Sequence, residues 1–225
     1  MDLQPYLEVC RVLNRLVRSL RNNGCYVLGA HMTTSCFGLG RSMLIGRKLG
    51  VKKIRIGARP LLEGLSFIEM GEDFWAQEGL WMEAISSHNG QAFTPRIIIG
   101  RRVRMSRFVH IAATNLVEIG DDVLVGSNVL ITDHNHGQYS RRHTPPHIAP
   151  SLRPLDEDRQ VRIGSNVWLG DGVVVAPGAS IGEGAVIGAH SVVLGCIPPF
   201  AIASGAPATV RKNFNYDSQQ WSSIR

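Results

Sequence analysis

The sequence is poor in aromatic residues, in cysteine pairs and in long apolar runs. Aromatic residues make up only 7% of the 225 positions, and the four cysteines include no CxxC pair. Isolated cysteines of this kind indicate reduced thiols rather than a disulfide framework. No apolar run approaches the roughly 18 residues of a membrane-spanning helix, and no secretory signal opens the chain. We therefore expect a soluble, cytoplasmic protein.

The chain has an excess of basic residues, with a formal net charge of +6 and an isoelectric point near 9.5. This balance favours an anionic ligand or surface. No aromatic-studded basic groove or recognition motif is visible, so we expect no nucleic-acid partner. A phosphorylated cofactor such as coenzyme A, or an anionic membrane, explains the charge equally well.

What the chain does have is glycine and a period of six, which is clearest from Val161 to about Ser204. One aliphatic residue returns at every sixth position: Ile163, Leu169, Val175, Ile181, Ile187 and Val193. This period fits neither the roughly 3.6 residues of a helical turn nor the alternation of a long strand. It fits short strands separated by regular turns, each strand pointing one aliphatic residue inward. The pattern predicts a parallel β-helix, in which each coil buries its apolar side by stacking on the next.

The repeats and their ending, Ile197–Ala208, resemble the hexapeptide-repeat acyltransferases, and within them the acetyl-CoA-dependent sugar O-acetyltransferases. The resemblance implies an all-β, left-handed parallel β-helix with three hexapeptides per turn. It also implies acetyl-CoA as co-substrate, a saccharide acceptor, and a homotrimer. Each active site of such a trimer lies between the prism-shaped β-helices of two subunits. The segment from Asp133 to Gly137 looks closest to the branch that serves capsule, exopolysaccharide and lipopolysaccharide synthesis.

The domain layout follows from where the repeats begin, break and end. We expect the β-helix over residues 45–204, with an irregular register in the early coils and a C-terminal tail over 205–225. Prolines and charges between residues 137 and 160 predict an excursion loop, because they cannot continue an interior coil. An amphipathic helix within residues 1–22 either caps the open end of the coil or rests its arginines on anionic lipid.

Two histidines at the root of the excursion loop, His134 and His136, are the candidate catalytic residues. Histidine titrates near neutral pH and can draw a proton from a hydroxyl group. Thr132-Asp133-His134 resembles the catalytic-histidine segment of the family, which implies His134 as general base and His136 as a neighbour that orients the substrate. Asp133 could hold the imidazole in the useful tautomer, but adjacent residues on a strand normally face opposite sides, and we expect the same here. The alternative is that both histidines are solvated loop residues.

The segment from Asn166 to Asp171 resembles the family's NVWIG motif, which borders the pantetheine arm of coenzyme A. The match implies that four residues line the cofactor groove between prisms: Trp168, Gly170, Asp171 and Ala189. Arg211 and Lys212 follow the cap and could hold a phosphate. The sequence departs from the family at Leu194-Gly195, where a polar or basic pair is usual. The alternative for Trp168 is packing at a subunit seam.

Trp81 and Glu83 are the candidate acceptor-binding residues, because sugars bind aromatic faces and carboxylates; otherwise they fill a core or an interface. The expected function is acetyl transfer from acetyl-CoA to a sugar hydroxyl, in surface-polysaccharide synthesis, with no metal. Three alternatives remain open. They are N-acetylation of an amino sugar or other small amine, a zinc protein like the γ-type carbonic anhydrases, and a non-catalytic scaffold. The tight spacing of His134 and His136 differs from the wider histidine spacing of the zinc enzymes.

Overall fold

The computed structural model describes residues 38–139, 143–156 and 159–224. Residue contacts divide the chain after Arg41, and the description below concerns the unit Ser42–Arg225. The helix expected within residues 1–22, whether as a cap or on lipid, lies outside the described residues. Helical residues run from 38 to 49, so residues 45–49, which we expected to begin the β-helix, are helical instead, and the first strand begins at Arg55.

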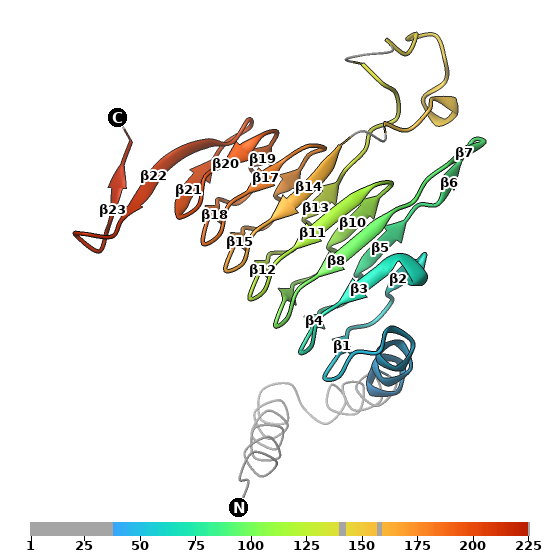
Figure 1. Ribbon diagram of the computed structural model, residues 1–225, viewed down its shortest axis with the longest axis horizontal. Helices are drawn as coiled ribbons and strands as arrows, with labels where there is room; N and C mark the ends of the chain where they lie inside the picture. Colours follow the sequence, from blue (N-terminus) through green and yellow to red (C-terminus); the bar gives the residue numbers. More distant parts are fainter. Residues whose placement is uncertain (1–37, 140–142, 157–158, 225) are drawn as a thin grey trace, which may run out of the picture. The chain divides into compact units, whose positions relative to one another are not determined.

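The chain winds as a coil of short parallel strands that form three sheets (Figure 1). The sheets are called A, B and C in the order in which each coil visits them. Sheet A contains β1 (Arg55–Ile56), β4 (Trp75–Ala76), β9 (Arg104–Met105), β12 (Leu124–Val125), β15 (Trp168–Leu169), β18 (Val186–Ile187) and β21 (Ala201–Ser204). Sheet B contains β2 (Leu61–Glu63), β5 (Trp81–Ala84), β10 (His110–Ala113), β13 (Leu130–Thr132), β16 (Val174–Val175) and β19 (Val192–Val193). Sheet C contains β3 (Ile68–Met70), β8 (Arg96–Ile99), β11 (Leu116–Ile119), β14 (Gln160–Ile163), β17 (Ser180–Ile181) and β20 (Cys196–Ile197).

The core is a stack of the aliphatic residues that the six-residue period marks. All six of them are at most 2% exposed: Ile163, Leu169, Val175, Ile181, Ile187 and Val193. The smaller residue two positions earlier is also buried, as at Val161, Val173 and Ala185. The strands of one sheet align in register, so that Leu169 lies beside Val125 and Ile187. Each coil therefore covers the apolar side of its neighbour, and the prediction of a parallel β-helix is confirmed.

Two corners of the coil repeat the same tight turn, while the third does not. The turns from sheet C to sheet A and from sheet A to sheet B place their third residue in the left-handed region. Examples are Asp122 with φ 59° and Asn128 with φ 58°. Asparagine, aspartate and glycine adopt this conformation most easily. From sheet B to sheet C the connection varies, and two of these connections are long: residues 85–95 and 133–159.

The two ends of the unit depart from the coil. At its start, Ile45 and Leu49 of the helical segment pack against the core, and Ser42 Oγ accepts a hydrogen bond from Ile56 N at 2.9 Å. At its end, the expected tail folds as two antiparallel strands, β22 (Thr209–Asn215) and β23 (Gln220–Ser223), which extend sheet A. The six-residue period carries no signal for this hairpin, because it stops before it.

Candidate active site

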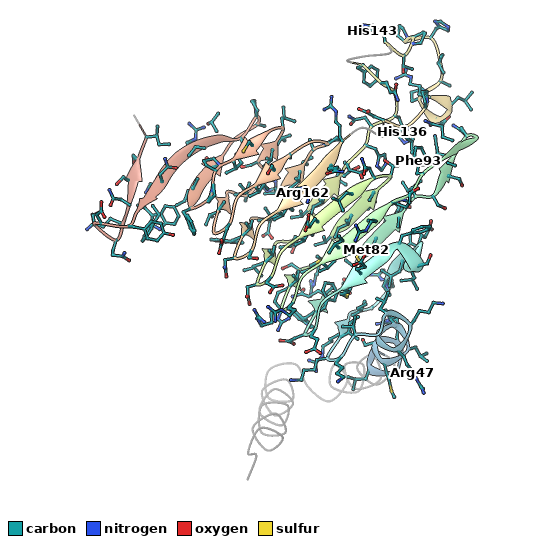
Figure 2. All side chains as sticks on the ribbon, in the orientation of Figure 1. Arg47, Met82, Phe93, His136, His143 and Arg162 are labelled. Atoms are coloured by element: carbon teal, nitrogen blue, oxygen red, sulfur yellow. The ribbon has the colours of Figure 1, made fainter. Side chains whose placement is uncertain are left out.

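The corner between sheets B and C gathers the irregular parts of the molecule. Residues 85–95 form a hairpin of β6 (Ser87–His88) and β7 (Gln91–Ala92), and residues 133–159 form the excursion loop, which includes the short 3-10 helix η2 (Pro150–Leu152). Parallel strands of one sheet end at the same edge, so both excursions leave from the same side of the coil. Figure 2 shows His136 where the loop leaves the coil and His143 far out along it.

His134 is the second residue after strand β13, at the start of the excursion loop. One of its two ring nitrogens contacts neighbouring side chains, and the other makes no hydrogen bond with the described residues. Its Nδ1 atom is 2.9 Å from Asp133 Oδ1 and 3.3 Å from Thr132 Oγ1. The side chain is only 9% exposed, and that of Asp133 is fully buried. Among the described residues, none makes a hydrogen bond with Nε2. When Nδ1 carries the proton and donates it to Asp133, Nε2 is the free base.

Asp133 is itself fixed by backbone donors of the neighbouring coil. The amide nitrogen of Thr114 donates to Asp133 Oδ1 at 2.9 Å, and that of Asn115 donates to Oδ2 at 2.8 Å. These bonds hold the carboxylate in one orientation under the imidazole. The expectation that Asp133 points away from His134 was therefore wrong. Strand β13 ends at Thr132, so the alternation of side chains no longer applies to the two residues that follow.

His136 occupies a different environment, because it is exposed and stands at the entrance of the loop. Its backbone bridges to Leu155 on the returning strand of the loop, and its carbonyl oxygen accepts a hydrogen bond from Tyr139 Oη at 2.6 Å. Its ring meets the ring of His88 edge to face, with centroids 5.4 Å apart. The structure thus places His136 beside the hairpin and His134 beside Asp133.

The hairpin and the excursion loop are joined by side-chain contacts to the backbone. Leu155 N donates to Gln91 Oε1 at 2.8 Å, and the amide of Asn89 donates to Ser151 O at 2.7 Å. Leu155 is 1% exposed, so this junction is well packed. Sequence reasoning missed the hairpin, although Asn89-Gly90 is a strong turn signal, with φ values of 46° and 81°.

Arg153 organises the inside of the excursion loop. Its guanidinium donates to Ile148 O at 2.8 Å, to Pro146 O at 3.0 Å and to Tyr139 Oη at 2.9 Å. One side chain therefore ties the outgoing and returning halves of the loop to each other. The described part of the loop is therefore held together by its own contacts, and it begins at the candidate catalytic histidines.

The residues expected to bind the cofactor come together at the corner between sheets A and B. Gly170 approaches Ala189 so closely that a Cβ atom would lie 2.6 Å from the Ala189 amide nitrogen. Trp168 projects outward from β15 and is 52% exposed. Asp171 has one carboxylate oxygen engaged already, since Ser127 N donates to Oδ1 at 2.5 Å. Part of the role of Asp171 is therefore to hold the turn of the coil before it.

Arg211 and Lys212 lie on β22, and they differ in orientation. Lys212 is in the row of outward residues that contains Trp168, since register pairs link Trp168 to Val186, Val186 to Ile202 and Ile202 to Lys212. Three strand spacings place this lysine roughly 14 Å from the tryptophan. The Arg211 side chain folds back to Ser204, with Nε donating to Oγ at 3.3 Å.

Trp81 and Glu83 lie side by side on the outer face of sheet B, and His110 on the next strand joins them. The Trp81 and His110 rings are stacked at 3.9 Å with an interplanar angle of 8°. His110 Nε2 is 3.2 Å from Glu83 Oε2. Sequence reasoning singled out the tryptophan and the glutamate but not His110. The period of six gives no hint of this contact, because it involves three residues from two coils.

Two further findings concern metals and membranes. Within residues 38–139, 143–156 and 159–224, no group of three or more histidine, cysteine, aspartate or glutamate residues is placed to hold a metal ion. In the same part of the chain, no helix has the length and apolarity needed to cross a membrane.

Comparison with known proteins gives the family. The model of the bacterial transferase hexapeptide (six repeats) matches residues 160–195. A protein of Escherichia coli (strain K12) named "Putative lipopolysaccharide biosynthesis O-acetyl transferase WbbJ" is 40% identical over 156 residues, which cover 68% of this chain and 76% of that protein. The chain belongs to the hexapeptide-repeat acetyltransferases. The coil is accordingly the left-handed β-helix of this family.

A second relative agrees with this assignment, and a solved structure agrees with the fold. The galactoside O-acetyltransferase of Escherichia coli (strain K12) is 29% identical over 194 residues, which cover 83% of this chain and 86% of that protein. A crystal structure of a mutant of AntD, an N-acyltransferase from Bacillus cereus, in complex with dTDP-4-amino-4,6-dideoxyglucose and coenzyme A, has a TM-score of 0.57. It is 15% identical and covers 71% of this chain and 80% of its own, so it supports the fold alone.

Proposed function

We propose that the protein transfers the acetyl group of acetyl-CoA to a hydroxyl group of a sugar in bacterial surface-polysaccharide synthesis. The observation that carries the chemistry is the imidazole of His134, held at Nδ1 by the buried carboxylate of Asp133. The sugar and the pathway are supported by the likeness to the lipopolysaccharide and galactoside O-acetyltransferases. The reaction takes place in the cytoplasm, where acetyl-CoA is made.

In the proposed mechanism His134 acts on the acceptor and no acyl-enzyme forms. Nε2 accepts the proton of the sugar hydroxyl while the oxygen attacks the thioester carbonyl carbon. The carbon–sulfur bond then breaks, and the imidazolium returns the proton to the leaving coenzyme A thiolate. The products are the O-acetyl sugar and free coenzyme A, with the imidazole again neutral. Asp133 stabilises the imidazolium and fixes the tautomer throughout.

The residues around Trp168 fit the pantetheine arm of coenzyme A. The exposed indole offers an apolar surface. Gly170, which packs closely against the Ala189 backbone, adds no side chain that would project beside the indole. At the other end of the row, Lys212 is exposed and supplies a positive charge for a phosphate. Arg211 contributes to the same field from beside Ser204.

We further propose a homotrimer, because the later coils expose apolar side chains on two of the three outer faces. Sheet A exposes Leu124 and Trp168, and sheet B presents Val174. Sheet C instead carries an ion pair of Glu118 with Arg162 on its outer face. A ring of three copies in head-to-tail contact buries one apolar face of each kind per interface and leaves the charged face in water. This arrangement places Trp168 of one copy close to the corner between sheets B and C of the next copy, which carries His134.

The direct test is a transfer assay with acetyl-CoA and a panel of methyl glycosides and oligosaccharides. We expect coenzyme A release that depends on the sugar, together with an O-acetylated product by mass spectrometry. Isothermal titration of acetyl-CoA separates the scaffold alternative, because a scaffold gives no heat of binding. Transfer to amino sugars only, with the product at nitrogen, would replace the proposed O-acetylation by N-acetylation. Light scattering measures the trimer, and an active monomer would refute it.

A further inference from the structure

The outer face of sheet B carries a row of apolar side chains in its first coils, with His110 as its one polar member. Register pairs align Leu61 with Trp81, Trp81 with His110, and His110 with Leu130. Leu61 is 45% exposed and Trp81 is 38% exposed, so this part of the sheet is not covered by other described residues. The row crosses four strands, a distance of roughly 14 Å from the first residue to the last.

Next to the apolar row, on the same face, lies a second row that contains two glutamates and a threonine, with Ala112 between Glu83 and Thr132. Glu63 pairs in register with Glu83, and one strand separates Glu83 from Thr132, whose hydroxyl contacts His134 Nδ1 at 3.3 Å. Two like charges on adjacent strands are unfavourable for the sheet itself. Each carboxylate, however, can accept hydrogen bonds from hydroxyl groups. The second row therefore runs from two hydrogen-bond acceptors to the candidate catalytic histidine.

The imidazole of His110 contacts one residue of each row. It stacks flat on the indole of Trp81 and reaches Glu83 with Nε2, so both neighbours are held in place. A preorganised aromatic pair beside a carboxylate matches a sugar ring, which has apolar C–H faces and a polar edge of hydroxyl groups. An apolar interface with another protein chain would not require the carboxylates of Glu63 and Glu83.

The later coils of the same sheet carry only apolar residues outward, as an interface with another protein chain would. The outward positions there are all uncharged: Val174, Ala176, Val192 and Leu194. Sheet B thus changes along its length from apolar with carboxylates to apolar alone. The second half suits a neighbouring copy, and the first half suits a ligand with hydroxyl groups.

We propose that the first half of this face binds the acceptor as a chain of sugars, so that the acceptor is an oligosaccharide or polysaccharide rather than a monosaccharide. This inference rests on the proposed acetyl transfer to a sugar. The row is longer than one sugar ring, so only a chain reaches Leu61 while its acetylated unit lies at Thr132 and His134. Trp81 and His110 bind the middle of the chain, and Glu83 holds its hydroxyl groups.

The experiment compares kcat/KM for methyl glycosides with the values for the matching di- and trisaccharides. The wild-type enzyme should favour the trisaccharide by about tenfold or more, as expected for one additional aromatic contact. Trp81→Ala should lower the trisaccharide value much more than the monosaccharide value, mainly through KM. Leu61→Ala, at the far end of the row, should lower the trisaccharide value alone. Trp221→Ala removes an equally exposed tryptophan from β23 and should preserve the wild-type ratio.

Two outcomes overturn the proposal while leaving the proposed function intact. One is equal kcat/KM for monosaccharides and trisaccharides in the wild-type enzyme. The other is a wild-type preference for the trisaccharide in folded, trimeric Trp81→Ala and Leu61→Ala variants. No transfer to any sugar, long or short, would instead refute the proposed function itself, and this inference with it.

Discussion

The corners of the coil differ in what they are built from, and the difference locates the chemistry. At the corner between sheets C and A, successive coils repeat one turn, and Arg101 and Arg102 pair with Asp121 and Asp122 of the next coil at 2.7 and 2.6 Å. At the corner between sheets B and C, the turn is replaced by a hairpin and a loop. An aspartate is also present there, but Asp133 is buried and binds a histidine. The first corner holds the coil together, and the second carries the candidate reactive groups.

The largest expected effect is that of removing the imidazole at the irregular corner. His134→Ala should lower kcat by roughly 10²–10⁴-fold, because the acceptor loses its general base. The affinity for acetyl-CoA, measured by titration, should not change, since the imidazole acts on the acceptor. His136→Ala should act mainly on the acceptor KM. Near wild-type transfer by His134→Ala, together with an inactive His136→Ala, would assign the base to His136.

An aspartate at each corner gives a matched pair of variants. Asp133→Asn should lower kcat on the order of 10²-fold, because the amide cannot stabilise the imidazolium. Asp121→Asn, at the repeated corner, should leave kcat unchanged. The comparison fails if both variants lose activity equally, which would point to a general loss of structure. Melting curves of both proteins provide the check.

Trp168 tests the repeated corner that we propose to face the cofactor. Trp168→Ala should raise the KM for acetyl-CoA by about tenfold, through loss of one aromatic wall. The acceptor KM should stay the same. An unchanged affinity for acetyl-CoA in a protein that no longer forms trimers would show that Trp168 packs at the subunit seam instead.

The smallest expected effect concerns stability in acid. Hydrogen bonds from Arg101 lower the pKa of Asp121 below its usual 3.8, and those from Arg102 lower the pKa of Asp122 in the same way. Their contribution is therefore present above pH 3.8 and is lost as the pH falls through the lowered values. Melting temperatures of Asp122→Asn should approach those of the wild type as the pH falls below 3.8. A difference that stays constant down to pH 2 would contradict this.

The regular part of the fold could be predicted from the sequence because its cause is local. Each of the buried aliphatic residues from Ile163 to Val193 occupies its position for the same reason, so a period of six is enough to find them. The loop was found in the same way, as a break in the period. The contact of Asp133 with His134 was considered but not expected, because the prediction treated both residues as neighbours on a strand, whereas strand β13 ends at Thr132. The hairpin at Ser87–Ala92 and the stack of Trp81 on His110 depend on contacts between coils, which the period does not report.

The central claim is that Asp133 and His134 act as one unit, and a double-mutant cycle measures this directly. The rates of acetyl transfer are compared for wild type, Asp133→Asn, His134→Ala and the double variant, at saturating acetyl-CoA and sugar. If Asp133 acts through the imidazole, the double variant should be no slower than His134→Ala, because the carboxylate has nothing left to orient. A double variant whose rate falls by the product of the two single effects would contradict the account.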